Sequence, residues 1–590
     1  MNREATASVP IDDDESIASV FAKRVAATPA KVAYGEFDAE TKQWRSRTWE
    51  EVAALAGRVA AALAAEGLAP GDRVAIMLRN CVEWVAFDIG AYRAGLVVVP
   101  LYVEDRPENF GYILGDAGVK VLLVGGEEHW KRIGEVRDLV SGLQRIVTLK
   151  PVGEAGDPRV VAWTQWLDSG AQTNPHAGDQ RRGGHDLATI VYTSGTTGKP
   201  KGVMLSHQNM LQNVKAALAV YDVYPGDLFL SFLPLSHMFE RTVGCYLTMV
   251  AGSQVTFARS IQQLSEDFIT VRPTIIVSVP RIFERLYAAI QASLESSPPA
   301  KRRMFELAHR TGWRVFEWRQ GRAGFKPQFL LWPLLKPLVA DKLLARLGGR
   351  VRLCISGGAA LSASISHAFI GLGVPICQGY GLTEAAPIVS ANTIERNEPA
   401  SIGMPLPGVE VRLGDNSVLQ ARGPNVMLGY WGNPEATARV KDAEGWLDTG
   451  DQAKWKDGFL YITGRIKEIL VLGNGEKVPP VDMELAILLD PLFEQVMVIG
   501  EGQPYLTALV VLNAAEAAKL GAVDEKLATG RIAGLIKGFP GYAQIRRVAI
   551  VDEKWTVENG LLTPTLKLRR AQVLERHRDR IEALYKGRRP

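Results

Sequence analysis

The segment YTSGTTGKPKGVMLSH (192–207) has the residue types of a phosphate-binding loop. Small residues and hydroxyls let backbone N–H groups and side chains approach phosphate oxygens, and lysines supply positive charge. It is not a Walker A loop, because the span from Gly195 to Gly198 is too short and Pro200 follows the lysine. A string rich in Gly, Ser and Thr can also be a flexible surface turn. The candidate phosphate ligands are Thr193, Ser194, Gly195, Thr196, Thr197, Gly198, Lys199 and Lys201.

The same string resembles the signature of the AMP-forming acyl-adenylating superfamily. That family includes acyl-CoA synthetases, firefly-type luciferases and the adenylation domains of peptide synthetases. Further segments resemble its other motifs in the same order and extend over nearly the whole chain. They are LPLSHMFER (233–241), ISGGAAL (355–361), QGYGLTEAAP (378–387), GWLDTGD (445–451), GRIKEILVLGNGEKV (464–478) and TPTLKLRR (563–570).

The resemblance implies a reaction in two halves. A carboxylate attacks the α-phosphorus of ATP and pyrophosphate leaves, and the acyl-adenylate is then captured by a thiol. Negative charge accumulates near the α-phosphate, so catalysis depends on positioning and electrostatic stabilisation. The implied ligands are ATP, Mg²⁺ and CoA, together with the acid.

Four residues resemble the family's catalytic groups. Glu384 matches the carboxylate that organises Mg²⁺, which the hydroxyl of Thr196 would also contact. Thr383 would contact the α-phosphate. Lys567 resembles the mobile C-terminal lysine that reaches the α-phosphate and the substrate carboxylate, although on charge pattern alone it is one more solvated lysine in a basic tail. His237 occupies the gate position near the acyl carboxylate, where an isolated histidine is more often structural.

A second set resembles the nucleotide site. Tyr380 has the ring to stack on adenine, although an isolated Tyr-Gly pair is more often a turn with a core tyrosine. Asp451 can accept two hydrogen bonds from the ribose diol, and alternatively caps a turn. Arg465 resembles a second contact to ribose or phosphate. The remaining candidates, mostly small residues that bring backbone close to the base, are Gly357, Gly358, Ala359, Gln378, Gly379 and Gly381.

The elements that must position these residues alternate in type. The segment 72–78 has the pattern of a buried strand, 83–95 that of a helix and 97–102 that of another strand. Strand, helix and strand at this spacing predict a parallel sheet with crossover helices, so the fold class is α/β. The pattern resumes over 227–280 and near 350–361, whereas short turn-separated segments after residue 400 predict a β-rich unit.

The resemblance also implies a domain organisation. Residues 1–464 are expected to form a large AMP-binding domain of two α/β layered subdomains plus a small β-barrel-like subdomain. Residues 465–468 would be the hinge, with Lys467 at the hinge position, although an exposed charge explains this lysine equally well. Residues 469–590 would be a small, mobile α+β domain.

The composition bounds the class of protein. The 590 residues are 47% hydrophobic and 22% charged, with 68 basic and 64 acidic side chains, which excludes global disorder and gives no sign of nucleic-acid binding. Four widely separated cysteines form no metal-ligand pattern and predict reduced, mostly buried thiols. The acidic N-terminus lacks a signal-peptide pattern, and no apolar run is long enough to span a membrane. A cytoplasmic protein is expected.

Three segments resemble long-chain fatty acid–CoA ligases more than other branches: PLYVEDRPENFGYIL (100–114), SVPRIFERL (278–286) and VENGLLTPTLKLRR (557–570). The expected function is therefore activation of a long fatty acid and its transfer to CoA. The alternatives are a ligase for aryl acids, bile acids or a carrier protein, and a non-catalytic binder of lipid or nucleotide. Retention of Thr383, Glu384, Asp451, Arg465 and Lys567 argues against a non-catalytic protein.

Residues 301–326 carry eight lysines and arginines against Glu306 and Glu317, with Trp313, Phe316, Trp318 and Phe325 interleaved. The apolar, proline-broken FLLWPLLKPLVA (329–340) follows. This combination is typical of an element that lies on an anionic bilayer, so peripheral association with the inner face of a membrane is one interpretation. The other is an amphipathic helical hairpin packed on the body with its arginines in solvent.

Overall fold

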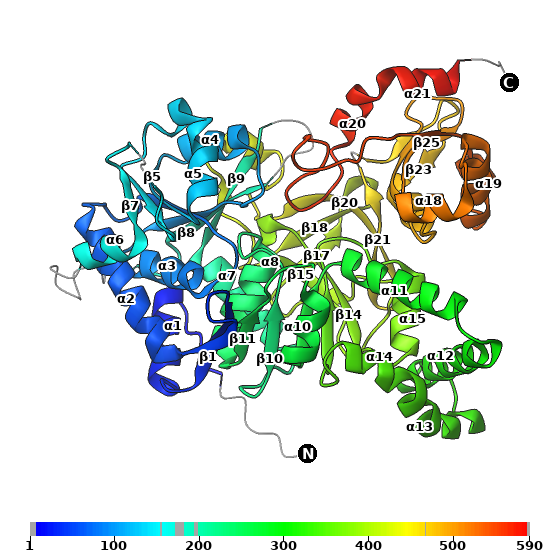
Figure 1. Ribbon diagram of the computed structural model, residues 1–590, viewed down its shortest axis with the longest axis horizontal. Coiled ribbons are helices and arrows are strands. Elements are labelled where there is room, and N and C mark those ends of the chain that lie inside the picture. Colours follow the sequence, from blue (N-terminus) through cyan, green and yellow to red (C-terminus); the bar gives the residue numbers. More distant parts are fainter. Residues whose placement is uncertain (1–7, 154–155, 171–181, 194–198, 467, 587–590) are drawn as a thin grey trace.

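The computed structural model describes residues 8–153, 156–170, 182–193, 199–466 and 468–586. Residues 194–198 of the predicted phosphate loop (Ser194, Gly195, Thr196, Thr197 and Gly198) and the predicted hinge residue Lys467 lie outside these ranges. Figure 1 shows two layered α/β parts, a smaller β part beside them, and a C-terminal part in orange and red at one end. The predicted α/β class is confirmed.

The first α/β part is built on an eight-stranded sheet in the order β19-β9-β8-β4-β3-β5-β6-β7. The strands from β8 to β7 are parallel to their neighbours, whereas β9 is antiparallel to β8 and β19 to β9. The strands are β3 (Arg73–Met77), β4 (Val97–Pro100), β5 (Val119–Val124), β6 (Arg145–Thr148), β7 (Val160–Ala162), β8 (Leu187–Thr193), β9 (Lys201–Ser206) and β19 (Gly429–Tyr430).

The second part is built on a nine-stranded sheet in the order β16-β15-β14-β13-β12-β10-β11-β1-β2. Its centre, from β14 to β1, is parallel, and both edges end in antiparallel strands. The strands are β1 (Val32–Asp38), β2 (Gln43–Thr48), β10 (Leu228–Ser231), β11 (Gln254–Phe257), β12 (Ile275–Ser278), β13 (Leu353–Ser356), β14 (Ile376–Gly381), β15 (Ile388–Ala391) and β16 (Met404–Pro405).

Helices cover both sheets (Figure 1), and one hydrophobic core contains side chains from both. Helix α2 (Trp49–Ala65) begins with a capping box in which Thr48 and Glu51 satisfy each other's backbone N–H. The helices of this region are α1 (Ile17–Ala27), α3 (Val82–Arg93), α4 (Pro107–Asp116), α5 (Glu127–Gly134), α6 (Trp163–Ser169), α7 (His207–Leu218), α8 (Met238–Glu240), α9 (Thr248–Ala251), α10 (Leu264–Val271) and α15 (Ala363–Gly371), with a π-helix η3 (Arg241–Leu247) and a 3-10 turn η1 (Arg137–Val140).

The segment between β12 and β13 is helical. It consists of α11 (Pro280–Glu295), α12 (Pro299–Arg319), a 3-10 turn η4 (Pro327–Leu331), α13 (Trp332–Leu335), a π-helical turn η5 (Lys336–Ala340) and α14 (Asp341–Arg346). The prolines divide the apolar run 329–340 into single turns. Within the described residues, no helix is long and apolar enough to cross a membrane.

The β-rich unit predicted after residue 400 contains a four-stranded antiparallel sheet in the order β17-β18-β20-β21. Its longest strands, β20 and β21, form a hairpin whose turn contains Asp457 and Gly458, both at positive φ. The elements here are β17 (Glu410–Leu413), β18 (Val418–Arg422), β20 (Leu447–Lys456), β21 (Phe459–Arg465), α16 (Pro434–Ala438) and the 3-10 turns η6 (Thr383–Ala385) and η7 (Asp415–Ser417).

The C-terminal part has its own hydrophobic cores on the two faces of a three-stranded sheet, β24-β25-β26. These cores lie between Leu472 and Leu584, and the domain bounds themselves stay a prediction. The elements are β22 (Leu470–Val471), β23 (Lys477–Val478), α17 (Pro480–Ile487), β24 (Phe493–Ile499), β25 (Leu506–Leu512), α18 (Ala514–Leu520), α19 (Glu525–Leu535), η8 (Gly541–Ala543), β26 (Ile545–Ile550), α20 (Arg570–Arg576) and α21 (Arg578–Tyr585). Figure 1 shows the red loop before α20 extending back toward the centre of the molecule.

Candidate active site

The two ends of the predicted phosphate loop are held together by strand pairing. Thr193, the last residue of β8, is the cross-strand partner of Lys201, the first residue of β9. The ammonium group of Lys199 lies 5.0 Å from the centre of the Tyr112 ring, and that of Lys201 lies 5.0 Å from the centre of the Tyr430 ring. Both lysines therefore lie over aromatic faces beside the point where the loop leaves the sheet.

Glu384 lies in the turn η6 directly after Thr383, and it is hydrogen-bonded to β19, the strand that pairs with β9. The hydroxyl of Tyr430 donates a 2.9 Å hydrogen bond to its Oε1, and its backbone carbonyl accepts a bond from Met427. Tyr430 lies in β19, which pairs with β9 through Val203. The same tyrosine thus contacts both Glu384 and Lys201, which places a carboxylate and a loop lysine on one aromatic side chain.

Tyr380, Asp451 and Arg465 form a second cluster. The Tyr380 hydroxyl donates to Asp451 Oδ2 at 2.5 Å, and Arg465 Nε donates to Oδ1 at 2.8 Å. Asp451 and Arg465 are cross-strand partners in the β20–β21 hairpin, and Tyr380 comes from β14 in the nine-stranded sheet. Burial, and then the charge of Asp451, raises the pKa of Tyr380, so this hydroxyl stays protonated at neutral pH.

Small residues lie after β13 and in β14, two paired strands of which β14 carries Tyr380. A Cβ on Gly357 would lie 3.0 Å from the ring of Phe239, and a Cβ on Gly381 would lie 2.1 Å from the carbonyl oxygen of Pro387. Gln378 is buried in β14 and accepts a 2.7 Å hydrogen bond from the backbone N–H of Leu361. The glycines therefore permit close approach of neighbouring elements. Gly358, at φ +80°, and Ala359 follow β13 in an exposed turn, and Gly379 lies in β14.

His237 is the N-cap of α8, and its Nδ1 accepts a 3.2 Å hydrogen bond from the backbone N–H of Phe239. Burial, and then the positive charge of Lys567, lowers the pKa of His237 to about 4. The imidazole is therefore neutral at pH 7, with its proton on Nε2. A neutral Nε2–H can donate a hydrogen bond but carries no charge.

Lys567 lies in the loop that the C-terminal part extends toward the large domain (Figure 1). Lys567 is exposed, yet the surrounding protein removes enough water from its ammonium group to lower the pKa, and Arg465 lowers this pKa further. Asp451, Glu468 and Glu384 act in the opposite direction. These charges act on one ammonium group, and the same group lowers the pKa of His237. Lys567 is therefore within electrostatic range of residues predicted from four other motifs.

The arrangement combines the carboxylates of Asp451 and Glu384 with cationic side chains that suit an anionic ligand. The cationic side chains are Lys199, Lys201, Arg465 and Lys567. Within the ranges that the structure describes, no group of three or more His, Cys, Asp and Glu side chains could hold a metal ion. Glu384 nevertheless has the donor chemistry that Mg²⁺ prefers, and Mg²⁺ usually takes only one or two protein carboxylates and completes its shell with phosphate oxygens and water. Thr196, the other predicted metal contact, is outside the described residues.

Sequence reasoning missed Tyr430 and the direct bonds among Tyr380, Asp451 and Arg465. Part of the signal for the Asp451–Arg465 pair was available, because Asp457-Gly458 is a typical hairpin turn. The exact partner was not, because a register shift between Gln452 and Ala453 moves the pairing by one residue. Tyr430 gave no such signal, since a two-residue strand has no periodicity.

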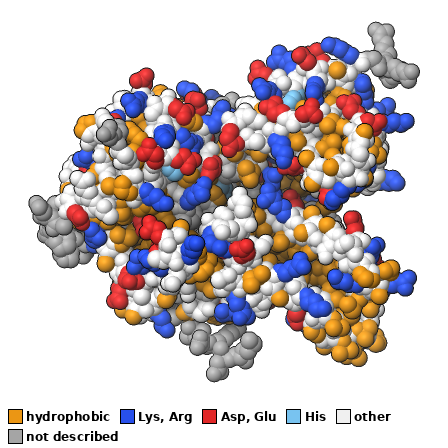
Figure 2. Space-filling model, viewed as in Figure 1, with side chains coloured by type: hydrophobic (Ala, Val, Ile, Leu, Met, Phe, Trp, Pro, Cys, Tyr) orange, Lys and Arg blue, Asp and Glu red, His pale blue; other side chains and the backbone are white. Residues whose placement is uncertain are grey.

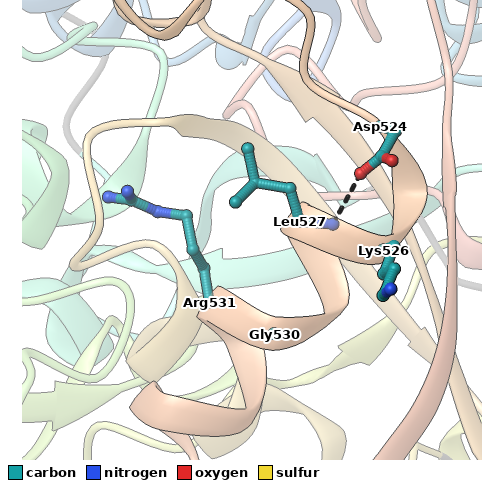
Figure 3. Close-up of a pocket in the computed structure, with 5 residues that line it drawn as sticks. All are labelled: Asp524, Lys526, Leu527, Gly530 and Arg531. Atoms are coloured by element: carbon teal, nitrogen blue, oxygen red, sulfur yellow. Dashed lines mark hydrogen bonds between the residues drawn. The ribbon is translucent and has the colours of Figure 1, made fainter.

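The pocket drawn in Figure 3 lies elsewhere, on α19 of the C-terminal part. Asp524 caps the helix by accepting a 2.7 Å hydrogen bond from the backbone N–H of Leu527, and Arg531 donates to Asp490 at 2.7 and 2.9 Å. None of its lining residues belongs to the predicted site. These polar groups have structural partners, so this pocket is not a second candidate.

Comparison with family models decides the family. The model described as "AMP-binding enzyme" matches residues 21–431, and "AMP-binding enzyme C-terminal domain" matches residues 467–589. The chain belongs to the AMP-binding enzyme family. It is an AMP-forming acid–thiol ligase of the adenylate-forming acyl-CoA ligase superfamily, as the sequence motifs predicted.

Named relatives and solved structures agree with this assignment. The chain is 33% identical to the long-chain-fatty-acid–CoA ligase FadD15 of Mycobacterium bovis, with 92% of each chain covered. It is 30% identical to human long-chain-fatty-acid–CoA ligase 1, covering 92% of this chain and 82% of that one. Among solved structures it resembles the anthranilate CoA ligase AuaEII in complex with anthranoyl-AMP, with a TM-score of 0.75 at 21% identity over 97% of this chain and 99% of that one. At that identity the likeness concerns the fold alone.

Proposed function

We propose that this AMP-binding enzyme is a long-chain fatty acid–CoA ligase. It would activate a long fatty acid with ATP, release pyrophosphate, and pass the acyl group from acyl-AMP to the thiol of CoA. One observation carries the adenylation half-reaction. The ammonium group of Lys567, in the C-terminal part, is within electrostatic range of Asp451, Arg465 and Glu384, which come from other motifs. The relatives named as long-chain ligases, at 30% and 33% identity over most of both chains, support the choice of acid.

In this proposal each cluster holds one part of the reactants. Asp451 and Arg465 hold the ribose, with Tyr380 packed between Asp451 and the adenine. The phosphate loop, with Thr193, Lys199 and Lys201, holds the phosphates, and Thr383 contacts the α-phosphate. Lys567 counters the charge that develops as the carboxylate oxygen attacks the α-phosphorus. His237 would orient the acid, and because its imidazole is neutral with the proton on Nε2, it would do so without adding charge.

Glu384, with Thr196, would hold Mg²⁺, which when bound neutralises phosphate charge during pyrophosphate release. Tyr430 is then a positioning residue, because its hydroxyl fixes one oxygen of the Glu384 carboxylate and leaves the other for the ion. This assignment uses a bond that sequence reasoning did not anticipate.

Replacing Tyr430 by phenylalanine is expected to weaken MgATP binding and to shift the dependence of pyrophosphate release to higher free Mg²⁺, each by roughly tenfold. The removed bond is one to a charged group, for which the expected loss is about 1.5 kcal/mol or more. Calorimetric titration with ATP at several Mg²⁺ concentrations measures the first effect, and a pyrophosphate-release assay the second.

The matched control is Tyr542→Phe, which changes an exposed tyrosine in the C-terminal part. It should behave as wild type. If Tyr430→Phe also leaves the Mg²⁺ dependence unchanged, the positioning role assigned to Tyr430 is wrong.

The acid specificity is tested with a panel from acetate to oleate, extended by benzoate and cholate, in the presence and absence of CoA. Each buried methylene contributes roughly 0.8 kcal/mol, so kcat/KM should rise by at least about 100-fold between butyrate and a sixteen-carbon acid. Pyrophosphate release should depend on the acid, and AMP should accumulate in multiple turnovers only when CoA is present. Best turnover with benzoate, cholate or acetate, or faster transfer to a carrier protein than to CoA, would contradict the proposal.

A further inference from the structure

The hairpin of α12 and α13 leaves an apolar surface in contact with solvent. Of the 22 large hydrophobic side chains exposed in the described part of the chain, seven lie between residues 307 and 338. Figure 2 shows a dense group of hydrophobic side chains at the lower right, where Figure 1 places α12 and α13. We call this surface the hairpin face. Its members are Leu307, Trp318, Phe325, Leu330, Leu331, Leu334 and Leu338.

The hairpin face is regular rather than a scatter of single residues. Around α13, Trp332 and Leu335 are buried in a local core, whereas Leu331, Leu334 and Leu338 are 44%, 65% and 49% exposed. Spacings of three and four put those three on one side of the helical turns. The turns are thus apolar on both sides, with one side packed and the other open to water. Such a segment is normally buried on all sides.

Basic side chains continue the hairpin face along α12. Ala308, Thr311, Gly312 and Val315 form the buried side of that helix. Beside it runs a stripe at spacings of four, three, four and four, which places its members on one sector of the helix. The Trp318 ring then packs against Phe325, with centroids 5.7 Å apart, and joins the stripe to the apolar end. The stripe is Arg303, Leu307, Arg310, Arg314 and Trp318.

Basic residues greatly outnumber acidic ones in this region. Residues 301–346 contain eleven lysines and arginines and three acidic residues, a net charge of +8, whereas the whole chain carries +4. The remainder of the chain is therefore net negative. Of the three acidic residues, Glu317 is paired with Arg322 and Asp341 with Lys336. A second copy of this chain would bring the same +8 to the contact, which disfavours self-association through this face.

We propose that the hairpin face binds an anionic lipid bilayer, with the exposed leucines and Phe325 entering the interface and the arginine stripe on the headgroups. The combination of apolar side chains, an interfacial tryptophan and flanking arginines matches the chemistry of the bilayer surface. It requires no spanning helix, in agreement with the short turns of this segment. The proposal goes beyond the proposed ligase activity and depends on a different surface.

The experiment is co-sedimentation of the full chain with vesicles of phosphatidylcholine alone or with about 30% phosphatidylglycerol. Wild type should pellet with the anionic vesicles at low salt and less at about 0.5 M salt, because the arginine contribution is screened. The variant Leu330→Ser/Leu334→Ser/Leu338→Ser should bind at least about tenfold more weakly at either salt concentration. The variant Arg303→Ser/Arg310→Ser/Arg314→Ser should lose on the order of 100-fold at low salt.

The control Leu413→Ser/Leu520→Ser/Leu574→Ser removes three leucines that are also exposed but lie on other elements, and it should bind as wild type. All replaced leucines are exposed, so circular dichroism and thermal melting should be unchanged. The proposal is overturned if wild type stays in the supernatant, or if the hairpin-face leucine variant binds like the control. It is also overturned if wild type is a dimer in light scattering and that variant loses the dimer instead of vesicle binding. None of these readouts requires catalysis, so they stand apart from the test of the ligase proposal.

Discussion

Lys567→Ala is expected to slow acyl-adenylate formation by about 10²–10³-fold while thioester formation from supplied acyl-AMP and CoA continues. The loss follows from removing one positioned cation from a transition state that develops charge at the α-phosphate. Thioester formation is spared because the α-phosphate is then a leaving group and no pyrophosphate is displaced. The surroundings of Lys567 support this assignment, since the charges of Asp451, Arg465 and Glu384 all act on the pKa of its ammonium group.

The two half-reactions are measured separately. Adenylation is followed by pyrophosphate release from acid and ATP, and thioester formation by the appearance of acyl-CoA from acyl-AMP and CoA. Lys526→Ala is the matched control, because it removes a lysine on an exposed surface of α19 in the same part of the chain. Melting temperatures of both variants should equal that of wild type. Equal losses in the two half-reactions would refute the role of Lys567.

The pKa of Lys567 adds a pH dependence. Burial and Arg465 lower this pKa from the usual 10.5, and adenylation requires the protonated form. The alkaline limb of kcat/KM for ATP should therefore begin below pH 10.5, since this parameter reports the free enzyme. In Lys567→Ala that limb should disappear from the residual rate.

Much of the fold could be predicted from sequence because its central elements are long or strongly patterned. The strand expected at 72–78 is observed as Arg73–Met77, and the helix expected at 83–95 is observed as Val82–Arg93. Continuous apolar runs are typical of strands covered on both faces. Short elements gave no such pattern. The π-helix Arg241–Leu247 and the turn Trp332–Leu335 are set by tertiary packing, which local periodicity does not record.

The candidate site was predictable as a set of motifs but not as a set of contacts. Glu384 and Lys567 are 183 positions apart in the sequence, and only the docking of the C-terminal part brings their charges together. Tyr430 is an example of a contact that the motifs could not predict. Its place beside the phosphate loop comes from the pairing of β19 with β9 and not from its neighbours in sequence. Motif spacing identifies residue types, whereas contacts between distant segments depend on the fold.

The sequence also left open what holds the LPLSHMFER segment (233–241) in place, and the structure gives a physical answer. Arg241, its last residue, is fully buried and forms an ion pair with Asp88 of α3. It also donates to the Thr189 hydroxyl of β8 at 2.9 Å and to the Tyr92 hydroxyl at 2.6 Å. Tyr246 donates to the other Asp88 oxygen at 2.8 Å. One guanidinium thus connects the helix after His237 to the strand that leads into the phosphate loop.

Asp88→Ala should therefore destabilise the large domain by about 3–5 kcal/mol, because it leaves the buried Arg241 charge without its partner. A fall of roughly 3–5 °C in apparent melting temperature is expected in calorimetry, because the unfolding entropy of a domain this large makes each kcal/mol worth only about 1 °C. Asp168→Ala is the matched control. It breaks a 2.9 Å ion pair with Arg58, in which the Asp168 and Arg58 side chains are 73% and 52% exposed, and should cost less than about 1 kcal/mol.

The double replacement Asp88→Leu/Arg241→Met distinguishes a requirement for the ion pair from a requirement for packing. If the cost of Asp88→Ala comes from an unpaired buried charge, removing both charges and keeping the volume should recover a large part of the lost stability. Activity should recover less, because a methionine side chain in place of Arg241 cannot donate to Thr189, and the helix that carries His237 is then no longer tied to β8. A melting temperature for Asp88→Ala within about 1 °C of the Asp168→Ala control would contradict the stabilising role assigned to the pair, because a buried guanidinium that has lost its carboxylate must cost more than an exposed one.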